Sequence, residues 1–152
     1  MLALISSVGT LHRRDLEMAD PTLLDPDEAD CIVQGEWLAR NSASKMARIG
    51  TTPVIGAVQV WTQKGDLAAQ AIGKTTCLML GEYEGETDMF LASDTYAVGS
   101  ELTVQQITVD SVTRTGLCLA TAGEFVYGFC TELVANNNGL LRFQKISPYI
   151  KA

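Results

Sequence analysis

The chain has 152 residues, which is enough for one domain of ordinary size. Its 47 % hydrophobic content supports a packed core and argues against disorder over most of the chain. The formal net charge is −7, and no basic cluster occurs beyond Arg13 and Arg14, which argues against a protein that binds nucleic acid or an anionic membrane.

The first 30 residues differ in composition from the rest of the chain. They are rich in Asp and Glu from Asp15 onward and include Pro21 and Pro26, which push the residues before them toward extended backbone. The apolar residues among them follow no sustained helical period. We therefore predict an extended acidic N-terminal arm over residues 1–30, with a disordered tail as the alternative. The body is predicted to span residues 31–152.

The body has the residue pattern of strands. The predicted strands are Cys31–Leu38, Pro53–Thr62, Thr75–Leu80, Asp88–Ala92, Glu101–Asp110, Gly116–Ala120, Glu124–Val134 and Leu140–Ile146. Residues 41–50 and Lys64–Asp66 are predicted to be loop or turn, and Leu67–Ile72 is a candidate short helix. The alternation changes phase at Gln105, which indicates a bulge or a bend.

The run Asn136–Gly139 predicts a hairpin turn near the end of the chain. Gly139, and any Asn beside it, can take the positive φ that tight hairpin turns require. About seven to nine short strands with Gly-containing turns are typical of all-β folds. We therefore predict a mainly β protein, a compact antiparallel β-barrel or β-sandwich with an extended N-terminal arm.

The cysteines are expected to be buried free thiols. Cys31, Cys77, Cys118 and Cys130 have apolar neighbours and form no Cys-x-x-Cys pair, which argues against structural zinc. Burial as free thiols is the preferred state of such residues, and a disulfide is the alternative. The sequence has neither an export signal nor a stretch long enough to span a membrane. We therefore expect synthesis in a reducing cytoplasm.

The chain offers few residues for catalysis. The single histidine, His12, lies in the predicted arm, and no second histidine exists for a nucleophilic triad. The acidic run Asp25–Asp30 lacks the glycine and the spaced glutamate of an EF-hand loop. Gly73–Thr76 lacks the earlier glycine of a phosphate-binding loop. We therefore predict that the protein is not an enzyme and holds no metal or cofactor.

Aromatic side chains are the remaining candidates for a carbohydrate or peptide surface. They are Trp37, Trp61, Tyr83, Tyr96, Tyr127 and Tyr149. Because they are scattered singly along the chain, we expect them to fill the core or an oligomer interface instead.

Six segments follow one another in an order that one group of proteins shares. They are Asp20–Pro26, Gly35–Leu38, Ala71–Lys74, Leu80–Thr87, Gly128–Thr131 and Asn136–Phe143. This order resembles the small head decoration (cement) proteins of tailed bacteriophages. The resemblance implies a β-rich body, oligomers on the outside of an icosahedral head and stabilisation of the expanded capsid. It implies no catalytic residues.

On this resemblance we expect a structural virion protein, made in the host cytoplasm and located on the outer capsid surface, where it bridges neighbouring capsomers. The expected partners are the major capsid protein and further copies of the chain, as a homotrimer or homodimer. We expect the arm to lie across an adjacent subunit or the shell. Its expected anchors are Leu16, Met18, Pro21, Leu23, Leu24 and Pro26. The alternatives are a tail or head-completion protein, or a β module that binds a carbohydrate or small ligand.

Overall fold

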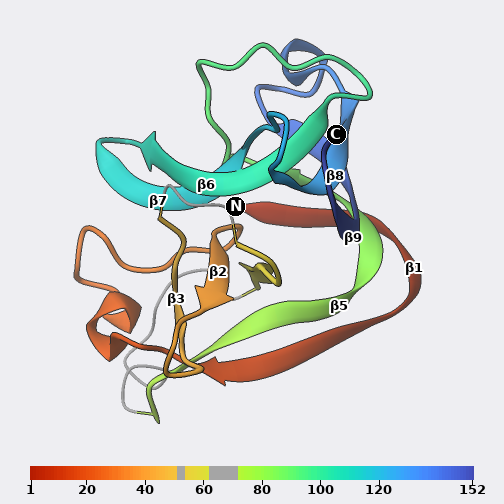
Figure 1. Cartoon of the computed structure of the whole chain (residues 1–152). Coiled ribbons are helices and arrows are strands. Elements are labelled where there is room, and N and C mark those ends of the chain that lie inside the picture. Colours follow the sequence, from red (N-terminus) through yellow and green to blue (C-terminus); the bar gives the residue numbers. More distant parts are fainter. Residues whose placement is uncertain (51–53, 62–71) are drawn as a thin grey trace.

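The computed structural model describes residues 1–50, 54–61 and 72–152, and the chain is mainly β (Figure 1). Within these residues the strands are β1 (Leu2–Glu17), β2 (Trp37–Arg40), β3 (Met46–Arg48), β4 (Val58–Val60), β5 (Lys74–Thr87), β6 (Glu101–Val109), β7 (Val112–Leu119), β8 (Phe125–Glu132) and β9 (Leu141–Ile150). Two short 3-10 helices, η1 (Pro21–Leu24) and η2 (Val134–Asn136), complete the described elements.

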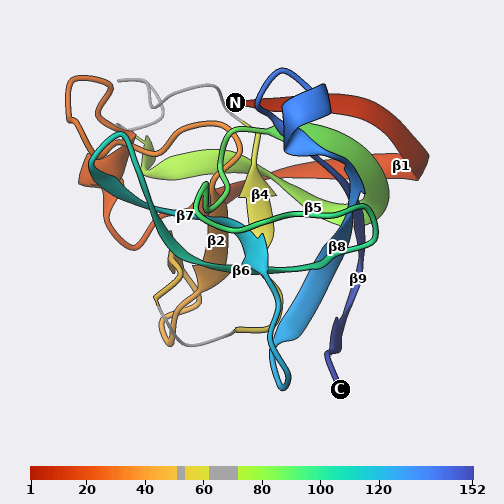
Figure 2. The ribbon, with the colours of Figure 1, turned by 90° about the horizontal axis from the view of Figure 1, so that it is seen from above.

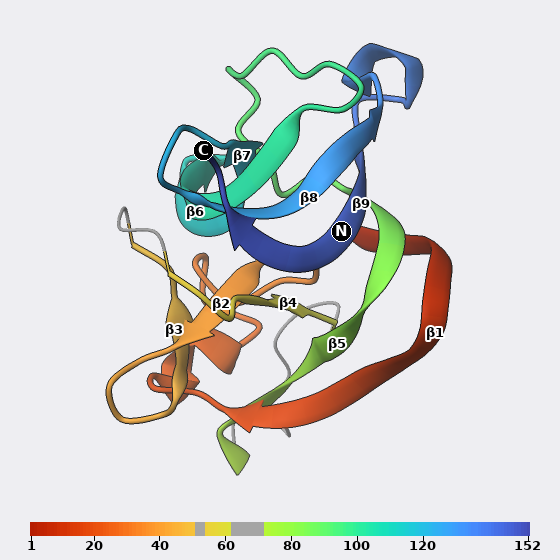
Figure 3. The same ribbon diagram turned by 45° about the vertical axis from the view of Figure 1, so that its right-hand side comes forward.

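The strands form two antiparallel sheets, of six and five strands, that share β1 and β5. One edge of β5 pairs with β1, and its other edge pairs first with β4 at Cys77 and Leu78 and then with β9 from Tyr83 onward. The small sheet is therefore β1-β5-β4-β2-β3, and the large sheet is β1-β5-β9-β8-β6-β7. The curved β1–β5 ribbon joins the two sheets along one side (Figures 1 and 3).

The arrangement is a β-sandwich, so the prediction of an antiparallel sandwich or barrel is confirmed in its sandwich form. Across the described residues the strand path does not close into a barrel. The main core fills the space between the two sheets, and Trp37, Tyr83 and Phe143 are almost fully buried there. The ring centroids of Tyr83 and Phe143 lie 6.0 Å apart in an edge-to-face contact, which aromatic pairs prefer.

A second core lies on the other face of the small sheet. Alternation along β2 sends Trp37 into the main core and Leu38 into the second core. The second core is covered by the segment that follows β1, which contributes Met18, Leu24 and Ile32. Asp20 caps η1 in this segment by accepting a hydrogen bond from the Thr22 N–H at 3.0 Å. The small sheet is therefore buried on both faces.

The first 30 residues are built into this body in the structure. Residues expected to form an extended arm on a neighbouring subunit or the shell make β1, which pairs with β5 along its length, and the segment that covers the second core. The predicted local effect of the prolines is confirmed, since Asp20 and Asp25, which precede Pro21 and Pro26, both have extended backbone. The pairing of β1 was missed because its partner β5 begins more than fifty residues after β1 ends, which no local pattern reveals.

Most other strand predictions differ from the structure in their bounds. Two predictions are wrong: Asp88–Ala92 forms no strand and makes only an isolated bridge from Phe90 to Leu117, and the predicted loop of residues 41–50 contains β3. The chain does close with a β8–β9 hairpin, and Asn138 and Gly139 take φ values of 54° and 80° in the connection. The β6–β7 ladder runs through Gln105 without a register shift, so the phase change marks the bend of β6 (Figure 1) and not a bulge. The predicted turn Lys64–Asp66, and the predicted helix Leu67–Ile72 apart from Ile72, lie outside the described residues.

Candidate functional site

A buried carboxylate links the two sheets. The Glu36 side chain has no exposed surface, and it accepts hydrogen bonds from Arg48 Nε at 2.9 Å and from the Arg114 guanidinium at 2.6 Å. Arg48 is on β3 and Arg114 is on β7, so the carboxylate ties the small sheet to the far strand of the large sheet. The Glu36 carboxylate is bonded to both arginines and to the Val33 N–H, so this cluster acts as a structural tie between the sheets.

The two outer strands of the sandwich are capped by their own chain. Beside β3, the Ala19 N–H donates to the Met46 carbonyl at 2.8 Å. Beside β7, the Leu117 N–H donates to the Met89 carbonyl, and the Leu91 N–H donates to the Leu117 carbonyl. Capping of this kind protects a sheet edge from pairing with another chain.

The outer edge of β1 pairs with no strand among the described residues, although at its start the Leu2 N–H donates to Gln34 Oε1 at 3.3 Å. Among the described residues β1 pairs only with β5, and it lies outside β5 in all three ribbon views (Figures 1, 2 and 3). Residues 2–11 contain no charged side chain. The charges that usually keep an edge strand from pairing with another chain are therefore missing there. Bulges near Ile5 and between Val8 and His12 bend the strand and divide it into short straight runs.

A pocket opens at the fork of the two sheets, where β5 changes its partner from β4 to β9. We call it the fork pocket. Its volume is about 370 Å³, and its lining includes Ala57, Glu82, Tyr127, Lys145 and Pro148. The residue at the change of partner, Gly81, has a φ of 107° and lines the same pocket. The fork pocket therefore follows directly from the way that β5 is shared.

Lys145 is the charged group buried in the wall of the fork pocket. Alternation along β9 places Lys145 on the same face as Leu141 and Phe143, which are core residues. The residue is only 8 % exposed, and its ammonium donates a hydrogen bond to the Gly81 carbonyl at 3.2 Å. Burial lowers the pKa of Lys145, while the carboxylate of Glu82 partly opposes this shift.

The tyrosines around this pocket are held by hydrogen bonds. The Tyr83 hydroxyl donates to Gln59 Oε1 at 2.5 Å, and burial raises the pKa of Tyr83 strongly. The Tyr127 hydroxyl donates to the Val54 carbonyl and accepts from the Ala57 N–H. These bonds fix the pocket wall by joining β5 and β8 to the region around β4.

The structure places the six predicted anchor residues within the body or on its surface. Leu16, Met18 and Leu24 are buried in the second core, and Leu23 is half-buried against it. Pro21 is exposed, and Pro26 is half-buried. Three of the expected anchors therefore serve the chain's own core, because they face the small sheet and not the solvent.

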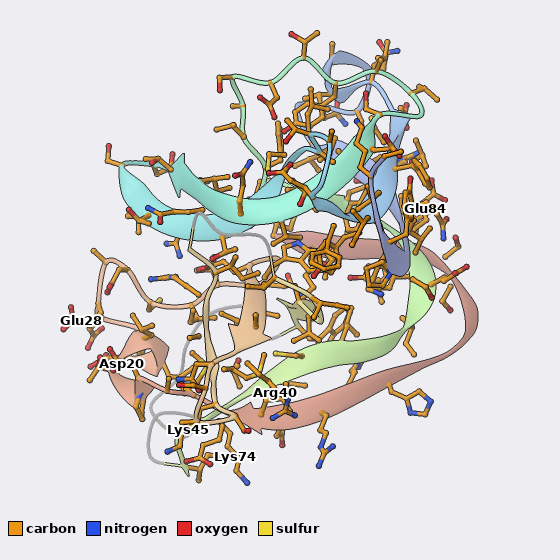
Figure 4. All side chains as sticks on the ribbon, in the orientation of Figure 1. Asp20, Glu28, Arg40, Lys45, Lys74 and Glu84 are labelled. Carbon is orange, nitrogen blue, oxygen red and sulfur yellow. The ribbon has the colours of Figure 1, made fainter. Side chains whose placement is uncertain are left out.

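The other sequence candidates are distributed without forming one site. Trp37, Tyr83, Tyr96 and Tyr127 are buried, as expected for core aromatics, and Tyr149 is exposed. All four cysteines are buried free thiols. Figure 4 shows Asp20 and Glu28 on the segment that covers the second core, with Lys45 and Lys74 below Asp20 in the same view. His12 is exposed on β1.

Within the described ranges, no group of three or more His, Cys, Asp or Glu side chains is arranged to hold a metal ion. No helix there has the length and apolarity that crossing a bilayer requires. Comparison of the chain with protein-family models, with curated proteins and with solved structures gives no match. The sequence motifs gave no indication of the Glu36 cluster or the fork pocket, although a lysine on the apolar face of Leu141–Ile150 was a readable signal for the pocket.

Proposed function

We propose that the chain is a structural virion protein, which binds the outer surface of an icosahedral phage head and stabilises the capsid by bridging neighbouring capsomers. The ordered sequence segments that resemble head decoration proteins support this proposal. A doubly buried small sheet and a buried ion cluster that ties the sheets together give the rigidity that such a role needs. The partners are the major capsid protein and further copies of the chain.

The observation that carries the proposal is the outer edge of β1, along which no second strand pairs among the described residues. The backbone of such an edge strand can accept an added strand from another polypeptide. Because β1 is shared by both sheets, a strand docked on it is supported by the whole sandwich. Bulges limit each straight run, so each docked contact is short and weak. Many copies on one shell compensate for this weakness by multivalency.

Leu16, Met18 and Leu24 were expected to anchor the chain on a neighbouring subunit or the shell, but their buried positions require another docking surface. These side chains cannot anchor a neighbour without leaving the second core. We therefore assign docking on the capsid to the outer edge of β1, beginning with its uncharged first half. Deletion of residues 1–24 would remove a shared strand and part of a core, so a point substitution is the sharper test.

The substitution Ile5→Lys tests this assignment. Ile5 is 43 % exposed on β1, and a lysine there adds the charge that guards natural edge strands. Purified protein is added to expanded heads stripped of the chain, and bound copies are counted after sedimentation. We expect Ile5→Lys to lose most of its occupancy and to melt close to the unmodified protein. Val98→Lys, which adds the same charge at an exposed apolar residue outside β1, is the matched control and should bind normally. Equal occupancy for both variants would exclude the β1 edge.

A further inference from the structure

The fork pocket arises because β5 changes its partner strand, and side chains of the described residues leave space at that point. Within the described part of the chain, the inner edge of β5 pairs with β4 up to Leu78 and with β9 from Tyr83 onward, so it changes partner between these two residues. The space left at this point has a volume of about 370 Å³, which is in the range of pockets that hold small ligands. Its position between three strands of fixed register makes it a preformed cavity.

Lys145 is a cation in the wall of this cavity that has no direct ion pair among the described residues, although the Glu82 carboxylate acts on it at longer range. An ammonium has three N–H donors, and the Gly81 carbonyl is its one hydrogen-bond acceptor across the described residues. None of the ion pairs formed by the described residues includes Lys145. The Tyr83 ring centroid lies 5.9 Å from Nζ, which gives a weak cation–π contact. Burial of a charge is costly unless the charge is paired.

We propose that the fork pocket is a binding site for a carboxylate group, which the ammonium of Lys145 receives as a charge-assisted hydrogen bond and ion pair. The geometry supplies a buried donor with free N–H valences and an adjoining wall of carbon from Ala57, Pro148 and the Tyr127 side chain. A carboxylate with a short apolar body matches both parts. This inference stands apart from the proposed capsid role, because it needs only the pocket.

Two neighbouring residues define what kind of carboxylate fits. Glu82 is exposed and lines the same pocket, so it repels a second negative charge and favours a monoanion over a dicarboxylate or a phosphate. Pro148 has no backbone N–H and cannot extend a ladder toward a docked strand. The pocket therefore suits an end group, such as a free organic acid or the C-terminal carboxylate of a polypeptide, and not an added β-strand.

The direct test is a titration of the full chain with hexanoate, followed by the NMR signals of 13C-labelled lysine side chains. We expect a saturable shift at Lys145, and no saturable shift with hexanamide, which has the same body without the charge. Lys145→Met should lower the hexanoate affinity by about tenfold or more, as loss of a hydrogen bond to a charged group does. Lys45→Met removes an exposed lysine outside the pocket and should leave the affinity unchanged. Equal binding of hexanoate and hexanamide, or equal binding by both variants, would overturn the proposal.

A second variant keeps the test independent of folding effects at Lys145. Glu82→Gln removes the repelling charge from an exposed position and should raise the affinity for hexanoate several-fold. An unchanged or weaker affinity would contradict the assigned role of Glu82.

A short peptide with a free C-terminus and its C-terminal amide then distinguish the two sources of carboxylate. Preference for the free peptide over hexanoate identifies a polypeptide end, and the opposite preference identifies a free organic acid. If neither hexanoate nor the free peptide binds, the proposed site is rejected. This outcome leaves the proposed capsid role unaffected, because capsid binding is measured separately.

Discussion

At the scale of single residues, the Glu36 carboxylate is a buried polar group that joins the two sheets. It is fully buried and receives two arginines, from β3 and β7, together with the Val33 N–H at 3.1 Å. A buried ion pair of this kind contributes little compared with apolar packing, but removal of one partner leaves uncompensated charge. The tie between the sheets therefore rests on one side chain.

We predict that Glu36→Gln destabilises the protein by about 3–5 kcal/mol, because Arg48 and Arg114 lose their shared counter-charge. Urea unfolding, followed by circular dichroism, measures this change. The exposed pair of Glu17 and Lys45, whose charged atoms are 2.7 Å apart, provides the control. Glu17→Gln should leave the unfolding midpoint almost unchanged. Similar midpoints for both variants would show that the buried cluster is not a structural tie.

The buried thiols make the free energy of unfolding decrease as the pH rises into the alkaline range. Burial raises the pKa of Cys77 from 9.0 to about 12. The unfolded thiol ionises above about pH 9 while the folded thiol stays protonated, so its stabilising contribution is complete below pH 9 and is lost as the pH rises toward 12. We predict that the free energy of unfolding falls above pH 9, with about 1.4 kcal/mol per pH unit from each such thiol.

Cys77→Ala should reduce this slope, although the cavity it creates lowers stability at neutral pH. The comparison is made by urea unfolding of both proteins between pH 7 and pH 10.5. Because the buried tyrosines titrate in both proteins, the difference between the two slopes isolates the thiol. Parallel pH profiles would contradict a raised pKa at Cys77.

At the scale of elements, close packing around β7 depends on a glycine. A Cβ built on Gly116 would lie 2.5 Å from the Met89 carbonyl oxygen, which belongs to the segment that caps β7. We predict that Gly116→Ala displaces this cap and destabilises the protein by about 1–3 kcal/mol, as overpacking does. Gly50→Ala, where no atom lies within 4 Å of the added Cβ, is the matched control. Thermal melting of both variants measures the difference, and equal losses would show that the cap is not tightly packed.

The elements also show how far local sequence patterns extend. The β8–β9 connection was predictable because Asn138 and Gly139 have residue types that accept positive φ. The β6–β7 turn was not, because Asp110 and Ser111 take positive φ without a glycine. Strand β1 was missed for a different reason, since its partner is remote in sequence. Arg114 is likewise 78 residues from Glu36, so the buried cluster depends on the fold and not on a motif.

At the scale of the whole molecule, the shared β1–β5 ribbon determines both candidate surfaces. It leaves one long strand edge that pairs with no further strand among the described residues, and it opens the fork pocket where β5 changes partner. The mainly β fold class was predictable from composition and from the residues typical of turns. The sequence offered Lys145 as a signal for the pocket but could not locate either surface, because each arises from pairings between distant segments.

Self-association follows from the same exposed edge. We predict that the purified chain, of 16.4 kDa, forms a homodimer or homotrimer at micromolar concentration, since uncapped edges pair with available strands. Light scattering coupled to size exclusion measures the mass. Ile5→Lys should shift the mass toward that of a monomer, whereas Val98→Lys should not. A monomer for the unmodified chain would contradict self-association, and a ring of six or twelve copies would favour a tail or head-completion role.

The most direct measurement is a density gradient of a lysate of its natural host, with each fraction probed for this chain. The capsid role predicts cosedimentation with intact heads, in a copy number comparable to that of the major shell protein. Absence of the chain from intact heads would contradict the role.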